Sequence, residues 1–172
     1  MLTLLGVFNR EPMMPAPPQL LTEPFLQLPT ANAVQVVWFT EFAGSQHAVT
    51  YGAGLKQTAI ASTVKLSRTR EDRESHVGAQ AETGQYQNIK LRDIWRHEAK
   101  VTGLSAGVRV PYRVSSVRED GTTFSSGEYT LASLPESGTP LKILLTSDHQ
   151  LKPMTAANLQ KVVETVGRVD GV

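Results

Sequence analysis

The chain has 172 residues, with 17 Lys and Arg against 16 Asp and Glu and no cysteine. This length allows one domain, or one domain and part of another, with room for a sandwich-sized core. The balanced charge provides no basic field for nucleic acid or an anionic membrane, and the lack of cysteine excludes disulfides, cysteine zinc sites and thiol nucleophiles.

The first 23 residues are predicted to form an extended arm outside the fold. They contain Pro12, Pro15, Pro17 and Pro18, each of which lacks a backbone donor and fixes φ. Residues 1–8 are apolar but have neither a basic start nor a small-residue cleavage site, so a signal peptide is not expected. No stretch reaches the roughly 18 to 20 apolar residues of a membrane span, and the compartment stays open.

From Ala33 the apolar residues recur at every second position, which is typical of half-buried strands. The first such face is formed by Val34, Val36, Trp38 and Thr40. It predicts a strand with Trp38 in the core. The later positions are Val49 and Tyr51, before a glycine turn at 52–54, and then Ile60, Val64 and Leu66 in a further extended stretch.

Residues 68–84 are charged and polar with almost nothing to bury, so they predict an exposed loop or hairpin tip. Alternation resumes at Trp95, Ala99 and Val101, and again at Val108, Val110, Tyr112 and Val114, with Arg109, Arg113 and Ser115 on the opposite face. Pro111 interrupts the second run, and because proline cannot donate to a ladder it predicts an edge strand or a bulge. A final strand is predicted over residues 124–131.

Six or seven short strands with turns between them and no helical period predict a mainly β fold for residues 24–134. The expected architecture is an antiparallel β-sandwich. Trp38, Trp95 and Tyr112 are expected to be core or rim aromatics rather than a platform for a sugar.

The histidines of this region carry no ligand pattern. His47 and His97 fall within predicted strands and are expected to be packed or edge histidines rather than ligands, whereas His76 in the charged segment is expected to be solvated. The sequence contains no legible Ser/His/Asp constellation, glycine-rich phosphate loop or basic and aromatic stripe.

After a linker at residues 135–140, residues 141–172 have the pattern of one βα unit of a parallel sheet. Residues 141–146 predict a buried strand, residues 147–150 a polar tip, and Val169 the start of a next strand. A helix over about 156–166 is predicted from the spacing of Leu159, Val162, Val163 and Val166. Thr155 is the expected N-cap, and Gly167 is expected to end the helix in the left-handed conformation.

The predicted helix has an apolar stripe but no obvious partner surface within the chain. Burying four aliphatic side chains would contribute roughly 1.5 to 3 kcal/mol each, and a lone helix of this length is marginal in water. We therefore expect the tail to belong to a domain that continues past Val172, and the alternative is that it packs on the sandwich. In the isolated chain, the exposed stripe predicts self-association through the C-terminal helix.

Five short stretches of the predicted sandwich carry a further signal: Pro29-Thr30, residues 36–40 (VVWFT), residues 49–52 (VTYG), residues 97–104 (HEAKVTGL) and residues 112–114 (YRV). Together they resemble the fibronectin type III-like N-terminal domain of purple acid phosphatases and related metallophosphoesterases. Residues 143–148 (ILLTSD) resemble the first strand and first metal-binding motif of the calcineurin-like phosphoesterase domain that follows it. The most specific feature of the resemblance is that the sandwich motifs precede the phosphoesterase motif along the chain.

The resemblance implies hydrolysis of phosphate esters by a binuclear metal centre of the Fe, Zn or Mn class in the full-length protein. Asp148 follows the tail strand, and the carboxyl ends of parallel strands face the ligand crevice. The resemblance implies that Asp148 is a metal ligand. The family pattern is Asp-x-His. Here Gln150 occupies the histidine position and could bind a metal through its amide oxygen, while His149 lies between the two. Later motifs of the family have no counterpart, so this chain alone is expected to be inactive and to hold no stable metal.

Two functions therefore remain open. The first is the accessory sandwich and first βα unit of a two-metal phosphatase, with the sandwich as the scaffold of the catalytic domain. The alternative is a stand-alone sandwich that binds a protein or a carbohydrate, since such folds serve many roles.

Overall fold

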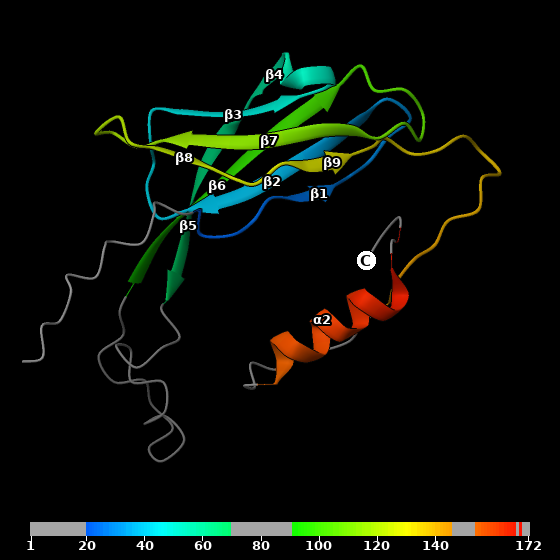
Figure 1. Ribbon diagram of the computed structural model, residues 1–172. Coiled ribbons are helices and arrows are strands. Elements are labelled where there is room, and N and C mark those ends of the chain that lie inside the picture. The colour runs from blue at the N-terminus through cyan, green and yellow to red at the C-terminus, as the bar shows by residue number, and fades with distance from the viewer. Residues whose placement is uncertain (1–19, 70–90, 146–153, 168, 170–172) are drawn as a thin grey trace, which may run out of the picture. The chain divides into compact units, whose positions relative to one another are not determined.

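The computed structural model describes residues 20–69, 91–145, 154–167 and 169 (Figure 1). The chain divides into two compact units, Met1–Leu134 and Pro135–Val172, and each is described by itself. The predicted arm up to residue 19 and the charged segment from residue 70 onward lie outside the described residues. The last part of the predicted arm belongs to the first unit, because Leu20 packs against the core and the Leu21 N–H donates to the Phe39 carbonyl at 3.1 Å.

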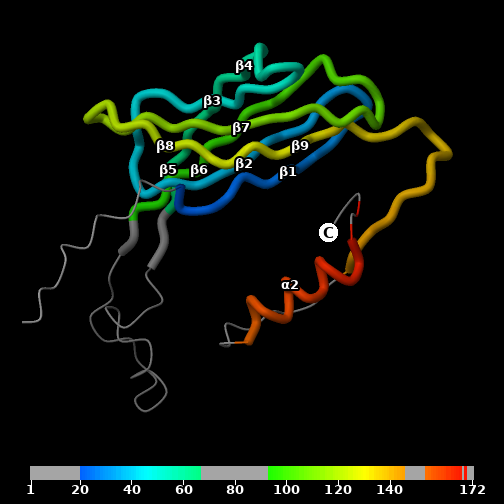
Figure 2. The backbone as a smooth tube through the Cα atoms, viewed as in Figure 1, coloured from blue at the N-terminus to red at the C-terminus, as the bar shows by residue number. Residues whose placement is uncertain are grey.

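The first unit consists of two antiparallel sheets, so the predicted mainly β sandwich is confirmed (Figures 1 and 2). Sheet 1 has the order β1 (Phe25–Gln27), β2 (Ala33–Thr40), β6 (Leu91–Thr102) and β5 (Ser62–Thr69). Sheet 2 has the order β4 (Gln57–Ile60), β3 (Gln46–Tyr51), β7 (Val110–Val117) and β8 (Thr123–Ser125), and β9 (Tyr129–Leu131) also pairs with β7. A short 3-10 turn, η1 (Ala53–Leu55), joins β3 to β4.

The core lies between the two sheets and contains many of the alternate residues that the sequence pattern singles out, although Ile60 and Val64 of that pattern are 66% and 55% exposed. Its buried members are Val34, Val36, Trp38, Val49, Tyr51, Ala99, Val101, Leu104, Tyr112, Val114 and Leu131. Trp38 is fully buried, as predicted, and no part of Val36, Val49, Val101 or Val114 is exposed. Each fully buried aliphatic side chain contributes roughly 1.5 to 3 kcal/mol, so this layer is the main source of stability.

Pro111 lies in an interior strand, so the predicted edge position is wrong. Strand β7 pairs with β3 on one side and with β8 and β9 on the other. The Pro111 carbonyl accepts a hydrogen bond from the Gly52 N–H at 3.0 Å. Because the nitrogen and carbonyl of one strand residue point the same way, the proline nitrogen also faces Gly52, where β3 has already ended. No ladder hydrogen bond is lost.

The segment 124–131 forms two short strands, β8 and β9, instead of the single strand predicted. Between them the Ser126 N–H donates to the Val114 carbonyl, and the Val114 N–H donates to Ser126 Oγ, both at 3.1 Å. A side-chain oxygen thus replaces a backbone carbonyl as the partner of β7, and the regular ladder stops there. Val108 is likewise outside its predicted strand and 52% exposed.

The second unit contains the helix α2 (Thr155–Val166), close to the predicted bounds. Met154, not Thr155, occupies the N-cap position. Gly167 ends the helix with φ of 67° and ψ of −151°, so its φ is positive, as predicted, but it is not in the left-handed helical conformation. The Gly167 N–H donates to the Val163 carbonyl at 2.9 Å, which closes the last turn.

The strand predicted over 141–146 is reduced to a single bridge residue, Ile143, within the described residues up to 145. A strand is stable only when neighbouring strands form hydrogen bonds with its backbone. The described part of the unit contains no strand that pairs along this segment. No residue of α2 is buried, and Val163 is 59% exposed. The described residues include no helix long and apolar enough to cross a membrane.

Candidate functional site

The two predicted metal ligands, Asp148 and Gln150, lie outside the described residues, as does His149 between them. Their prediction therefore stays untested. Among the described residues, no group of three or more His, Asp or Glu side chains is placed to hold a metal ion.

The most unusual polar cluster of the described residues lies between the two sheets, next to the apolar core. Its side chains come from five strands: Trp38 and Thr40 from β2, His47 from β3, Thr63 from β5, His97 from β6 and Ser116 from β7. His97 and Ser116 are fully buried, and His47 is 6% exposed. The rings of His47 and His97 stack with centroids 3.7 Å apart and planes 17° apart. Both histidines are packed, which is one of the two predicted outcomes.

The hydrogen bonds of His47 select one neutral form of its ring. Its Nε2 lies 2.6 Å from the Ala43 carbonyl, which can only accept, so Nε2 carries the proton. Its Nδ1 lies 2.8 Å from Ser116 Oγ. The Trp38 Nε1–H donates to that same Oγ at 2.8 Å, so the Ser116 hydroxyl is free to donate its own proton to Nδ1. The chain of donors runs from Trp38 through Ser116 to His47 and Ala43.

The hydrogen bonds of His97 select the same form. Thr40 Oγ1 donates its only proton to the Phe42 carbonyl at 2.6 Å. It must therefore accept from the Nε2–H of His97, which lies 2.8 Å away. The remaining nitrogen, Nδ1, accepts from the hydroxyl of Thr63 at 2.9 Å. All four ring nitrogens of the pair are thus occupied while both rings are neutral.

The electrostatics of the pair agree with this assignment. Burial, together with the neighbouring His47 ring, lowers the pKa of His97 from 6.5 to about 3. Burial also lowers the pKa of His47, although the Ala43 carbonyl and the Glu119 carboxylate act in the opposite direction. Two unit charges at such a separation repel each other by about 4 kcal/mol at an effective dielectric of about 20. Double protonation of the stack is therefore strongly disfavoured.

Ser116 and His47 have the contact of a nucleophile and its general base, but the surroundings exclude that chemistry. Ser116 is fully buried, so a substrate cannot reach its Oγ. Its oxygen already accepts the indole proton of Trp38. The third partner is the Ala43 carbonyl rather than a carboxylate, and it cannot balance an imidazolium as an aspartate does.

A pocket of about 750 Å³ opens beside this cluster. Residues 43–47 of the β2–β3 loop and of β3 line it, together with Ala61, Thr63 and Trp95. Gly44 forms part of its wall with φ of 68°, and its N–H donates to the Glu119 carboxylate at 2.7 Å. The loop is therefore held to the end of β7.

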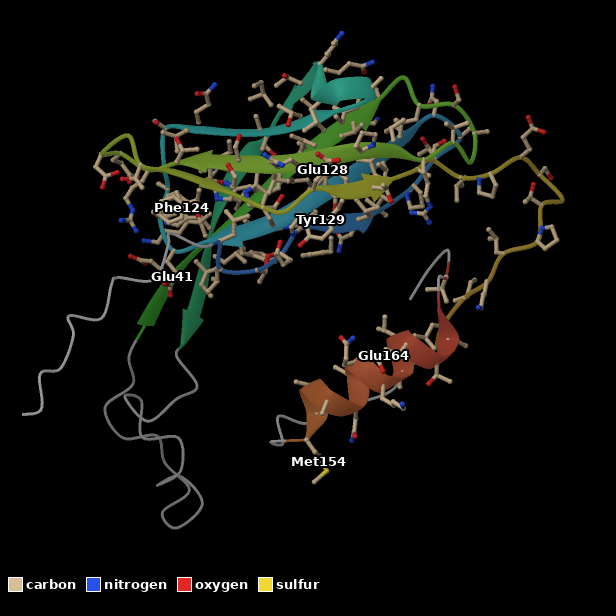
Figure 3. The ribbon with its side chains drawn as sticks, viewed as in Figure 1. Glu41, Phe124, Glu128, Tyr129, Met154 and Glu164 are labelled. Carbon is tan, nitrogen blue, oxygen red and sulfur yellow. The ribbon has the colours of Figure 1, made fainter. Side chains whose placement is uncertain are left out.

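An aromatic cluster lies at the same loop. The rings of Phe42 and Phe124 lie 4.8 Å apart, and the Arg118 guanidinium stacks 5.2 and 5.1 Å from their centroids. Figure 3 shows Phe124 at the end of the sandwich where the β2–β3 loop, which begins at Glu41, meets the β7–β8 hairpin. These contacts tie the two sheets together beside His47.

Sequence reasoning did not identify the histidine cluster, although a signal for it exists. His47 has the strand parity of Val49 and Tyr51, and His97 has that of Ala99 and Val101. Side chains of equal parity point to one face, so both histidines are inward-facing polar residues. Buried polar groups need partners, but only the pairing of distant strands identifies which ones.

These features define an antiparallel β-sandwich with a polar, stacked histidine pair in its interior, followed by a separate unit that carries the helix α2. No family model matches the chain, and no curated protein matches it. Among solved structures, it is similar to the purple acid phosphatase PPD1 from seeds of yellow lupin (Lupinus luteus), with 20% identity and a TM-score of 0.48. The match covers 70% of this chain and 21% of that protein, so the chain spans about a fifth of its length.

Proposed function

We propose that this chain is the accessory sandwich and the beginning of the catalytic domain of a metal-dependent phosphoesterase of the purple acid phosphatase type. The sandwich would be of the fibronectin type III kind, at residues 24–134, with a linker at 135–140 and the phosphoesterase domain starting at 141. In the complete protein it would scaffold a catalytic domain that hydrolyses phosphate esters.

One observation carries this proposal: an antiparallel sandwich is followed, in a separate unit, by the motif at residues 143–148. The sandwich motifs of the resemblance fall on its buried strands. Residues 36–40 lie in β2, residues 49–52 at the end of β3, and residues 112–114 in β7.

A binuclear metal centre does not fit the described residues. His47 and His97 each have both ring nitrogens in hydrogen bonds, and no acidic cluster lies beside them in the described part of the chain. The proposed ligands are Asp148 and Gln150, with the remaining ligands supplied by residues beyond this chain. The sandwich would thus support the metal centre without contributing a ligand to it.

The purified 172-residue chain is expected to hydrolyse no p-nitrophenyl phosphate and to retain no stoichiometric metal, because two metals need ligands from several strand ends. The measurements are turnover and metal content after dialysis against Fe, Zn or Mn. Turnover that follows bound metal and disappears in Asp148→Asn would contradict this expectation.

The proposal itself is tested on the longer polypeptide that the gene encodes when it is read past Val172. We expect this polypeptide to hydrolyse p-nitrophenyl phosphate with two bound metals. Asp148→Asn should lower kcat by at least about 100-fold through the loss of a ligand. Asp120→Asn, in the exposed β7–β8 turn, is the matched control and should leave kcat unchanged. A gene that encodes nothing after Val172, with a soluble chain that binds a protein or sugar, would favour the stand-alone binding module instead.

The exposed residues of α2 support a second expectation, self-association of the isolated chain. Leu159 and Val163 are 36% and 59% exposed, and both belong to the apolar stripe. Leu159→Gln/Val163→Gln should lower the apparent mass measured by light scattering, whereas the control Asn158→Gln/Gln160→Asn should not. An apparent mass that is equal in all three proteins would rule out association through this stripe.

A further inference from the structure

We propose that the stacked His47–His97 pair is an acid-sensitive latch, which holds the two sheets together while both rings are neutral and releases them in mildly acidic medium. This role is independent of the proposed phosphoesterase function. It depends only on contacts within the first unit.

The pair joins the two sheets directly. His47 lies in β3 of sheet 2 and His97 in β6 of sheet 1, and their rings are in stacking contact at 3.7 Å. A second link runs beside the first, because Trp38 of sheet 1 donates to Ser116 of sheet 2 at 2.8 Å. The Ser116 hydroxyl then contacts Nδ1 of His47. Protonation of a ring therefore acts on the contact between the sheets.

Each ring accepts a further proton only at Nδ1, since each Nε2 already carries one. At His47 that nitrogen faces the Ser116 hydroxyl, and at His97 it faces the hydroxyl of Thr63. Each hydroxyl now donates to the ring, so it would have to turn away and accept instead. If Ser116 Oγ, which accepts from Trp38, also accepted from the charged ring, its own proton would lose His47 Nδ1 as acceptor. A charged ring would thus break the network and would stand against its stacked neighbour.

The charged groups around the pair do not compensate for this. Glu119, at the end of β7, favours a charge on His47, but its carboxylate is bound by the Gly44 N–H. Arg118, beside it, is positively charged and stacks on Phe42 and Phe124. On β5 and β6, Lys65 and Asp93 have the strand parity of the Thr63–His97 pair and form an ion pair at 2.9 Å. Arg96 and Glu98 flank His97 in the sequence, lie on the opposite face of β6 and pair with each other. Glu41 lies exposed in the β2–β3 loop.

The direction of the pH effect depends on whether the folded or the unfolded state binds more protons at the two rings. In the unfolded chain a histidine titrates near 6.5, whereas in the fold the pKa of each ring is lower. The unfolded state therefore binds more protons below about pH 6.5. The stabilisation is complete above that pH and is lost as the pH falls below it. For each unit by which the pH falls, each histidine raises the unfolding equilibrium constant by up to about tenfold, and the pair raises it by up to about 100-fold.

Urea unfolding of the full chain between pH 7.5 and 4.5, followed by circular dichroism, tests the latch. The unfolding constant should rise steeply below pH 6.5 in the wild type. The double variant His47→Gln/His97→Gln retains a donor and an acceptor at each position but cannot titrate, so the histidine-dependent rise should be absent from it. The matched control is His76→Gln/His149→Gln, which removes the other two histidines and should retain the wild-type slope. Equal slopes in the wild type and the His47/His97 variant would overturn the proposal.

A second measurement, on the wild type, tests the latch even if the double variant does not fold. Nitrogen-15 NMR of the wild-type histidine rings should show two rings that remain neutral, with the proton on Nε2, for as long as the protein is folded. If all four rings titrate near pH 6.5 in the folded protein, the latch does not exist.

Discussion

Replacement of Trp38 with alanine is expected to lower the free energy of unfolding by about 3 to 5 kcal/mol, the typical cost of removing a buried tryptophan. Trp38 is completely buried in β2 and is among the largest side chains of the core. Its indole also donates to Ser116 and packs 5.5 Å from the ring of His97. The substitution would leave a cavity and also remove the donor that orients the Ser116 hydroxyl.

The other tryptophan is the control for this experiment. Trp95 points to the same face of sheet 1, but it is only partly buried and lies at the pocket, with Lys65 Nζ 5.4 Å from its ring. Trp95→Ala should lower the free energy of unfolding by about 1 kcal/mol. Both values are obtained from urea unfolding followed by circular dichroism. Similar losses in the two variants would mean that Trp38 is not the centre of the core.

Gly44→Ala is expected to destabilise the protein by about 2 to 5 kcal/mol, for two reasons that add. The backbone has φ of 68°, and an L-residue in this region costs roughly 1 to 2 kcal/mol. The added Cβ would lie 2.5 Å from the Val117 carbonyl and 2.7 Å from the ring of His47. Relief of such overlaps in a packed site costs about 1 to 3 kcal/mol more. The variant should also disturb the histidine pair.

Gly103 provides the comparison that separates these two effects. Its φ is 72°, almost that of Gly44, but a Cβ there would meet no atom within 4 Å. Gly103→Ala should therefore cost only the conformational part, about 1 to 2 kcal/mol. The difference between the two unfolding free energies isolates the close approach of Gly44 to Val117 and His47. If the two variants are equally stable, Gly44 of the β2–β3 loop does not pack closely against the ring of His47.

The alternation of apolar residues was sufficient to predict the class of the fold. It assigned Val36, Trp38 and Val49 to the core because a strand places alternate side chains on one face, and burial of that face dominates folding. The helical spacing of Leu159 and Val163 likewise predicted α2 almost to the residue. These are local properties of the chain, so they can be read without knowing which strands pair.

Where a partner distant in the sequence decides the outcome, the local pattern was not enough. The proline rule placed Pro111 at an edge or a bulge, but its nitrogen faces the end of β3, which the fold alone reveals. Ser126 divides the final strand because its hydroxyl takes the place of a carbonyl toward Val114. The strand predicted after residue 140 is a single bridge at Ile143 in the described residues.

By itself, the sequence determined the inner face of the strands around Trp38, Val49 and Tyr112, and the same parity applies to His47, His97 and Ser116. Only the tertiary structure decided that these three meet, because the register between β2, β3, β6 and β7 brings together residues separated by 50 or more positions. The physical reason is that the period of a strand sets the face of a side chain, whereas its contacts are set by the strands across the core. The neutral, stacked histidine pair is a product of that register.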